Sequence, residues 1–225
     1  MNGKQLAAEK AVEWIEDGMV VGLGTGSTAY WAIQAIGRKV AEGLSIRAVA
    51  TSIPSEELAR ELNIPLIPWS EITSIDVTID GADEVDGDYH LVKGGGGALL
   101  REKITAYASK CMIVIVDENK LVKQLGAFGL PVEVVPFAWE MTAKHLEKLG
   151  CKAIRRSHSD GGVFITDNGN YIMDCHFGSI QDAPELEQKL QHIPGIVEHG
   201  LFIGLADRVI IGYEHGTVKV RERSS

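Results

Sequence analysis

Two neighbouring stretches of the sequence combine carboxylates, lysines and glycines within a short span. The first is Asp80-Gly-Ala-Asp-Glu-Val-Asp86, and the second runs from Lys93 through Gly97 to Glu102 and Lys103. Successive glycines can adopt positive φ and bring their N–H groups close to a bound oxygen. We therefore expect residues 80–103 to carry the chemistry of the protein on an oxygen-rich ligand.

The elements around these residues explain how they would be positioned. Residues 75–79 alternate apolar and polar side chains, which is typical of a strand, and Asp80 follows at its carboxyl end. In open α/β sheets, ligands bind at that end of the strands. A helix begins directly after the glycines. Glu102 falls in its first turns, so its carboxylate can lean back toward the loop.

Simpler interpretations exist for each stretch alone. Four glycines can form a flexible connector, and an acidic loop can be merely solvated. Glycine is costly in conformational entropy, however, and a linker is not expected between a buried strand and an amphipathic helix. A calcium loop beginning at Asp80 is excluded because Ala82 and Val85 occupy its third and sixth positions. A magnesium site on Asp80 and Asp83 stays open as an alternative.

A second glycine loop lies near the start of the chain. Met19-Val-Val21 reads as a short strand, Gly22–Ala29 as a loop, and the residues up to Glu42 as a helix. Strand, glycine loop and helix together place free N–H groups and the positive end of a helix dipole at one point.

The ligand of this loop can be narrowed by its spacing. Ser27 stands where a dinucleotide fingerprint needs its last glycine, and no lysine precedes Ser27-Thr28 as in a nucleotide P-loop. Thr25, Ser27 and Thr28 offer hydroxyl groups that suit a phosphate monoester. The alternative is that Ser27 only caps the helix.

Further strand ends carry polar groups. Residues 44–50 form an expected strand that ends at Thr51-Ser52, where Ser52 is expected to cap the next helix. Met112–Val116 is apolar throughout, as in a parallel strand covered on both faces, and Lys120 follows it. The simpler interpretation of Lys120 is a surface charge. These junctions predict an α/β fold with a doubly wound, mostly parallel, Rossmann-like sheet and a pocket along one edge.

The pattern changes after residue 130. It predicts a smaller inserted α+β domain, ferredoxin-like, with a hairpin turn at Asp167-Asn-Gly169 between strands at 162–166 and 170–174. The predicted domains are residues 1–130 plus 204–225 for the catalytic part and residues 131–203 for the small part.

Composition excludes several classes of function. The chain has 225 residues and a formal net charge of −9, without the basic stripe that a nucleic-acid binder needs. The three cysteines form no CxxC, and the histidines show no metal-ligand spacing. No signal peptide or apolar run of membrane-spanning length is found. We expect a cytoplasmic protein with no nucleic-acid or membrane partner.

Taken together, the motifs resemble the type A family of ribose-5-phosphate isomerases. The resemblance rests on GLGTGSTA at 22–29, Thr51-Ser52, DGADEVD at 80–86, KGGGGALLREK at 93–103 and PVEVVPF at 131–137. It covers nearly the whole chain, but no family pattern is recognised at 155–160 or after Tyr213. It implies interconversion of ribose 5-phosphate and ribulose 5-phosphate through an enediolate, without a metal or organic cofactor, in a homodimer or homotetramer.

The resemblance also implies roles for individual residues. Glu102 matches the base, Lys93 and the following glycines the groups that stabilise the enediolate, and Asp80 and Asp83 the groups that bind substrate and pass protons among its oxygens. The substrate-binding residues implied are Thr25, Gly26, Ser27, Thr28, Asp80, Gly81, Ala82, Asp83, Lys93, Gly94, Gly95, Gly96 and Lys120.

Two other classes of protein deserve comparison. A non-catalytic sugar-phosphate sensor would keep the phosphate loop but would not require Glu102, Lys93 and Asp80 together. An acyl-CoA transferase, or another sugar-phosphate isomerase, on a similar fold is the second rival. The transferase would be expected to use a glutamate as a nucleophile.

Overall fold

The structure is a computed structural model that describes residues 2–223. The density of contacts along the chain divides it into two compact units. The first unit comprises the residues up to Ala82, Arg101–Leu121 and the residues from Gly204 onward; the second comprises Asp83–Leu100 and Val122–Ile203. Contacts thus group 83–100 and 122–130 with the second unit, whereas the sequence-based boundaries place them in the first domain. A division into independently folding domains stays a prediction.

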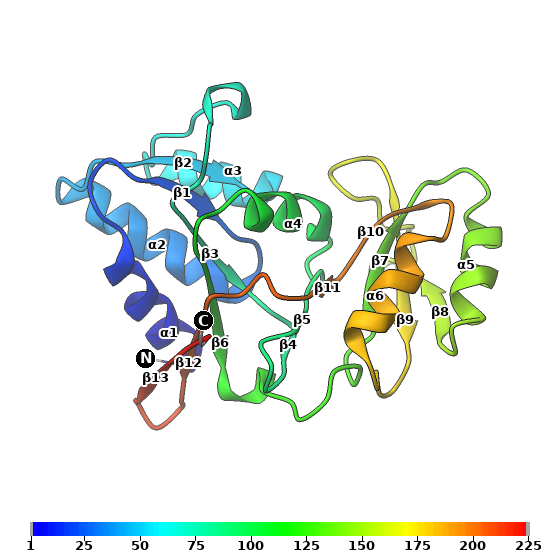
Figure 1. The fold of residues 1–225 in the computed structure, drawn as a ribbon. Coiled ribbons are helices and arrows are strands. Elements are labelled where there is room, and N and C mark those ends of the chain that lie inside the picture. Colours follow the sequence, from blue (N-terminus) through cyan, green and yellow to red (C-terminus); the bar gives the residue numbers. More distant parts are fainter. Residues whose placement is uncertain (1, 224–225) are drawn as a thin grey trace. The chain divides into compact units, whose positions relative to one another are not determined.

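The first unit is built on a six-stranded sheet in the order β13-β12-β6-β3-β1-β2 (Figure 1). Five neighbouring strands are parallel, and only β13 at the edge is antiparallel. This arrangement confirms the predicted α/β class with a mostly parallel sheet. The strands are β1 Val20–Leu23, β2 Arg47–Ala50, β3 Val77–Gly81, β6 Met112–Asp117, β12 Arg208–Gly212 and β13 Val218–Glu222.

Helices cover both faces of this sheet, as in a doubly wound fold. Alanines of α1 and the apolar stripe of α2 pack on Val21 and Leu23. On the opposite face, a methyl group built on Gly22 would lie 2.8 Å from Thr105 Cγ2 of α4, so that helix lies directly against the strand. The helices are α1 Gly3–Ala11, α2 Ser27–Ala41, α3 Ile53–Glu61 and α4 Leu99–Tyr107, with short 3-10 turns at Val12–Trp14, Trp69–Glu71 and Glu118–Lys120.

The first helix is shorter than its periodicity indicates. The apolar spacing predicts a helix over residues 4–17, but α1 ends at Ala11 and a 3-10 turn follows. Ile15 then adopts extended backbone, with φ −90° and ψ 126°, and buries its side chain in the core. The apolar spacing therefore continues past the end of α1, because the 3-10 turn keeps the side chains that follow directed into the same core.

The second unit contains a four-stranded antiparallel sheet in the order β10-β7-β9-β8. Its chain order is β7, α5, β8, β9, α6, β10, and the leucines of both helices share one core with β7 and β9. This is the predicted ferredoxin-like arrangement. A separate three-stranded sheet has the order β11-β5-β4. The elements are β4 Glu84–Val85, β5 Leu91–Val92, β7 Leu130–Val134, α5 Trp139–Glu147, β8 Lys152–Arg155, β9 Tyr171–His176, α6 Ala183–Gln191, β10 Ile196–His199 and β11 Leu201–Phe202.

The predicted hairpin at 162–174 is only partly correct. The turn forms, because the Gly169 N–H donates to Thr166 O, but 162–166 is no regular strand. The Phe164 N–H donates instead to Arg156 O, and β9 pairs with β7 and β8. Three side chains of the turn region also donate to one buried carboxylate oxygen of Glu133, which holds the turn against β7; they are those of Thr166, Asn168 and Asn170.

Among the described residues, every helix is too short or too polar to cross a bilayer.

Candidate active site

The first unit presents its polar groups where the strand order reverses. In the order β2-β1-β3-β6 the chain winds outward in both directions from β1 and β3. Such a switch point leaves a crevice at the carboxyl ends of the two strands. Gly24, which follows β1, donates its N–H to Ile79 O of β3 at 3.0 Å. The first glycine loop and Asp80 are therefore neighbours at this point.

Gly26 determines how the first loop enters its helix. It is the N-cap of α2, with φ 101° and ψ −178°, a conformation that a residue with a Cβ rarely adopts. Ser27 is the first helical residue and makes no capping bond, so the alternative that Ser27 caps the helix is wrong. The N-terminus of α2 thus begins at Ser27 and Thr28, and its N–H groups suit an anion.

Thr25 is the centre of a cluster of hydroxyl groups. Its Oγ1 lies 2.7 Å from Thr51 Oγ1 and donates to Ser52 Oγ at 2.8 Å. Ser55 Oγ donates to Gly24 O at 2.7 Å. Ser52 is also the N-cap of α3, as predicted. The hydroxyl of Thr25 is used inside the protein, so its direct contact with substrate stays a prediction.

Asp80 is a fully buried carboxylate near the carboxyl end of β3, one residue before Gly81. Its Oδ1 accepts the N–H of Thr25 at 3.0 Å and the N–H of Gly81 at 2.7 Å. A methyl group built on Gly24 would lie 2.6 Å from Asp80 Cα, so only glycine fits there. Asp80 therefore fixes the position of the first loop, whatever else it binds.

The other predicted residues of the first unit lie at neighbouring element ends. Glu102 is in the first turn of α4 and only 4% exposed. Lys120 ends the 3-10 turn after β6 and is half-buried. A methyl group on Gly81 would lie 3.7 Å from Thr28 Cβ, so these two predicted residues are adjacent. Ala82 is the last residue of this stretch of the first unit.

Lys93 opens the glycine loop of the second unit. It is only 2% exposed, and its Nζ lies 5.3 Å from the centre of the Phe202 ring. Its backbone N–H donates to Gly200 O at 2.8 Å. A lysine this deeply buried is uncommon unless its charge has a role.

The four glycines after Lys93 form a tight turn. Gly94 and Gly97 have φ of 104° and 78°, and the Gly97 N–H donates to Gly94 O at 2.9 Å. Asp83 Oδ2 accepts the N–H of Gly95 at 2.7 Å. The N–H groups of Gly94 and Gly96 donate no hydrogen bond within residues 2–223. These two donors therefore remain for a ligand.

One functional candidate in the first unit is absent from the sequence-based prediction. Lys4, in α1, donates from Nζ to Ser27 Oγ at 2.9 Å. Its ammonium group thus stands at the N-terminus of α2, where an anion is favoured. A single lysine in a charged N-terminal helix carries no signal in the sequence; only the packing of α1 beside α2 reveals it.

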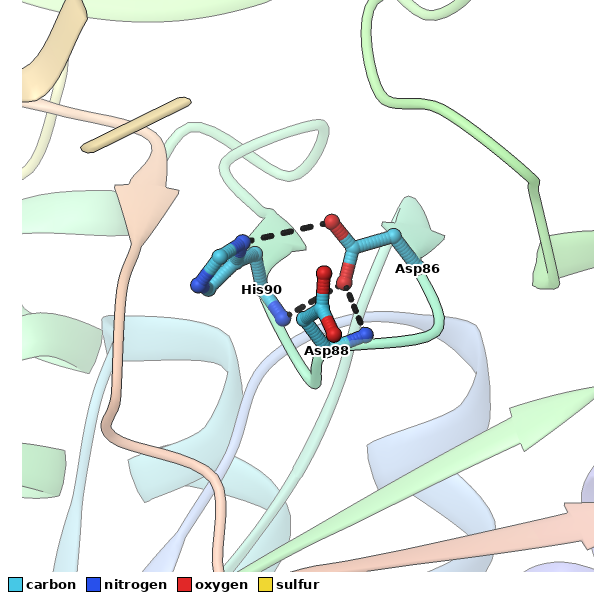
Figure 2. A group of neighbouring side chains, drawn as sticks. All are labelled: Asp86, Asp88 and His90. Atoms are coloured by element: carbon cyan, nitrogen blue, oxygen red, sulfur yellow. Dashed lines mark hydrogen bonds and ion pairs between the residues drawn. The ribbon is translucent and has the colours of Figure 1, made fainter. Parts of the chain in front are cut away.

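A group of metal-ligand types lies in the turn between β4 and β5. Figure 2 shows Asp86, Asp88 and His90, whose ligand atoms lie within 4.8 Å of one another. Asp86 Oδ1 accepts the N–H groups of Asp88 and His90, both at 2.9 Å, and the His90 ring faces its other oxygen. These hydrogen bonds stabilise the turn between β4 and β5, and this explains why the three side chains lie together. Asp80 and Asp83 are not part of it.

The chain matches known proteins along its length. The family model described as ribose 5-phosphate isomerase A (phosphoriboisomerase A) matches residues 47–216. The chain belongs to the ribose 5-phosphate isomerase A family. A ribose-5-phosphate isomerase A of Bacillus mycoides (strain KBAB4) is 53% identical over 217 residues, which cover 96% of this chain and 98% of that protein.

Solved structures agree with this family membership. A D-ribose-5-phosphate isomerase in complex with phospho-erythronic acid is 43% identical, with a TM-score of 0.95 over 99% of this chain and 100% of that one. The ribose 5-phosphate isomerase of Plasmodium falciparum is 38% identical, with a TM-score of 0.95 over 99% and 98%. The predicted family, fold class and isomerase class are confirmed, which favours the isomerase over the sensor and the transferase.

Proposed function

We propose that this member of the ribose 5-phosphate isomerase A family interconverts D-ribose 5-phosphate and D-ribulose 5-phosphate by proton transfer through an enediolate, with Glu102 as the base. The interconversion follows from the family. The observation that carries the role of Glu102 is its burial: a carboxylate 4% exposed, in the first turn of the helix that follows the glycine loop. A carboxylate so placed is a suitable general base.

The proposed reaction needs one base and one site for negative charge. Glu102 takes the proton from C2 of the open-chain aldose, and the electrons move to O1 of the enediolate. A proton then passes from O2 to O1, and return of the first proton to C1 gives the ketose with its carbonyl at C2 and a hydroxyl group on C1. No other group is gained or lost, so the step is balanced without a redox partner, and we propose neither a metal nor an organic cofactor.

Lys93 and the glycine loop are proposed to stabilise the enediolate. Donors directed at a developing oxyanion lower the barrier more than they strengthen substrate binding. Because Asp83 occupies the N–H of Gly95, the donors left are those of Gly94 and Gly96. Of the predicted glycines Gly94, Gly95 and Gly96, we therefore propose the first and last as donors to the enediolate. Gly95 is proposed to hold the loop in place through its bond to Asp83.

The phosphate is proposed to bind at the N-terminus of α2. Ser27 and Thr28 offer N–H and hydroxyl groups there, and Lys4 and Lys120 supply positive charge. Asp80 and Asp83, with Gly81 and Ala82 between them, are proposed to contact the sugar oxygens. The relative that holds phospho-erythronic acid supports a phosphorylated ligand with a carboxylate, which resembles an enediolate in shape and charge.

Assembly and location complete the proposal. We expect a homodimer or homotetramer in the cytoplasm. Exposed aromatic side chains such as Phe137, at 88% exposure, would favour association. Light scattering of the purified protein measures the mass of the assembly.

The experiment that tests the function follows ketose formation from ribose 5-phosphate in the presence of a chelator. The wild-type protein should turn over, and Glu102→Gln should lower kcat by about 10³-fold or more because the base is lost. Glu57→Gln, an exposed glutamate on α3, is the matched control and should keep full activity. An active Glu102→Gln enzyme would exclude Glu102 as the base.

A further inference from the structure

We infer that Arg156 is a positioning residue that aims the N–H of Gly96 at the enediolate oxygen. This inference rests on the proposed function and assigns a role to a segment in which the sequence shows no family pattern. Arg156 follows β8, about sixty residues after the glycine loop, and belongs to the same unit as the loop. It is proposed to act through the loop backbone and not by touching substrate.

The guanidinium group of Arg156 joins the loop to β9. Its Nη1 donates to Gly94 O at 2.9 Å and to Gly95 O at 3.1 Å. Its Nε and Nη2 donate to the two carboxylate oxygens of Asp174 at 3.0 and 2.6 Å. The side chain of Arg156 is 14% exposed and that of Asp174 23%. A bidentate pair with little exposure holds a planar guanidinium in one orientation.

Fixing a carbonyl also fixes an N–H, because the atoms of a trans peptide lie in one plane with the C=O and N–H pointing in opposite directions. In the peptide between Gly94 and Gly95, Arg156 holds the carbonyl and Asp83 accepts the N–H at 2.7 Å. This peptide is held at both ends.

The next peptide is held at one end only. Arg156 binds the carbonyl of Gly95, so the N–H of Gly96 points away from the guanidinium. That N–H donates no hydrogen bond within residues 2–223, and Gly96 is exposed. Of the two unused donors of the loop, the N–H of Gly96 is therefore the one whose direction depends on Arg156.

An aromatic ring restrains the end of the turn. Phe164 packs on Gly97: a methyl group there would lie 2.6 Å from Phe164 Cε1. The guanidinium carbon of Arg156 lies 5.6 Å from the centre of the same ring, and the Phe164 N–H donates to Arg156 O. Arg156 and Phe164 therefore hold successive parts of a loop that four glycines would otherwise leave mobile.

The chemistry of the site explains why an arginine is needed. Three nitrogens of one plane serve Asp174 and two carbonyls at once. A lysine has a single ammonium and cannot span the carboxylate and both carbonyls in a fixed geometry. Arg156→Lys keeps the positive charge but loses the fixed orientation of the donor groups. This variant therefore distinguishes a positioning role from an electrostatic one.

The test compares Arg156→Ala and Arg156→Lys with Arg155→Ala in the full-length enzyme. Arg155 is the matched control because its guanidinium stacks 4.4 Å from the centre of the Trp139 ring and lies 5.3 Å from that of Tyr171, and no hydrogen bond joins it to the loop. We expect kcat to fall about 100-fold in Arg156→Ala and about 10-fold in Arg156→Lys, with KM within about twofold, because the donor acts mainly in the transition state.

Two readouts distinguish positioning from a loss of folded protein. Phospho-erythronic acid carries a carboxylate in place of the enediolate, so its inhibition constant should rise in parallel with the loss of kcat. Free guanidinium ion should restore activity to Arg156→Ala but not to Arg156→Lys, because Arg156 and Asp174 line a cavity of about 460 Å³ that small molecules can enter.

The outcomes separate this inference from the proposed function. If the wild-type protein does not isomerise ribose 5-phosphate, the proposed function fails. If it does, and Arg156→Lys keeps its kcat, or the inhibition constant stays unchanged while kcat falls, the positioning role is overturned. Loss of activity that follows loss of folded protein by circular dichroism, without guanidinium rescue, also overturns it.

Discussion

The two glycine loops of this chain are each held by an aspartate of the same short stretch. Asp80 accepts the N–H of Thr25 in the first loop, and Asp83 accepts the N–H of Gly95 in the second. The first loop is otherwise held by hydroxyl groups of the next βα unit, within about thirty residues. The second is otherwise held by Arg156, which follows β8 about sixty residues further along the chain. Apart from the two aspartates, the first loop is held by hydroxyl groups near it in sequence and the second by a distant side chain.

The loops also differ in how tightly they are packed. A methyl group on Gly24 would meet the Cα of Asp80 at 2.6 Å, and that Cα belongs to a buried strand that cannot shift. A methyl group on Gly95 would meet the Oδ1 of Asp83 at 2.5 Å, and a side-chain oxygen can rotate away. The first loop is thus packed against a buried strand at Gly24, whereas the second loop is exposed at Gly95.

The largest expected effect comes from adding a methyl group to the first loop. Gly24→Ala should lower the free energy of unfolding by about 3 kcal/mol or more, because the methyl group overlaps the backbone of a buried strand. Urea denaturation followed by circular dichroism measures the change. A variant with wild-type stability would show that β3 can yield.

The same substitution in the second loop should affect catalysis instead of stability. Gly95→Ala should change the free energy of unfolding by less than about 1 kcal/mol, because Asp83 can rotate away. Its kcat/KM should fall about 10-fold, because the glycine turn shifts when Asp83, which accepts the Gly95 N–H, rotates. Steady-state kinetics and urea denaturation on one preparation give both values. Equal losses of stability in Gly24→Ala and Gly95→Ala would remove the distinction between the loops.

The hydroxyl cluster should contribute less than the packing at Gly24. Thr25→Val keeps the shape of the side chain but leaves the buried oxygens of Thr51 and Ser52 short of a partner, which should cost about 1–2 kcal/mol. Ser27→Ala, at the start of α2, is the control and should leave stability unchanged, because among residues 2–223 its oxygen bonds to Lys4 alone, at the surface. Thermal unfolding of the two variants measures the difference.

The smallest expected effect concerns the opposite end of β3. Asp76 accepts hydrogen bonds from Lys110 Nζ at 2.7 Å and the Val20 N–H at 2.8 Å, and these two bonds lower its pKa below the ordinary value of 3.8. A lowered pKa means that ionised Asp76 stabilises the fold above pH 3.8 and loses this contribution as the pH falls through its folded value.

Asp76→Asn should therefore be less stable than the wild type near pH 7. The difference should be below about 1 kcal/mol, because Lys110 is 64% exposed and solvent screens the pair. It should shrink as the pH falls below 3.8, because the carboxyl group of the unfolded wild-type chain is protonated there while that of the folded protein is still ionised. Urea denaturation between pH 7 and pH 3.5 measures both. A difference that grows toward low pH would contradict the assigned sign.

The sequence predicts the first loop better than the second because the elements that form the first loop are consecutive in the chain. Strand, glycines and helix are consecutive at residues 20–41, so the sequence predicts the first loop and the anion-binding helix end. The sequence also places Asp80 at the carboxyl end of its strand, where it is the second-last residue of β3. The cap at Ser27 was wrong because Gly26 takes that position, and a glycine N-cap leaves no side-chain signal.

The restraint of the second loop could not be predicted. Arg156 and Asp174 carry no motif, and the bonds that Arg156 makes to Asp174 and Gly94 depend on the register between β8 and β9. Lys4 was missed for a similar reason, because its contact with Ser27 depends on helix packing. Residues that act through tertiary contacts leave no periodic pattern in the sequence.

Because β3 lies inside the sheet, it should stay intact on heating for longer than the edge strands. β3 is hydrogen-bonded on both sides, to β1 and to β6, whereas β2 and β13 lie at the edges. Backbone amides of such a strand exchange with solvent only when the protein opens widely, while edge strands fray first. The amides around Asp80 should therefore be among the slowest to exchange. Brief heating should open the edge strands but leave Asp80, which holds the first loop, in place. On cooling, the first loop would then regain its structure without refolding of the whole unit.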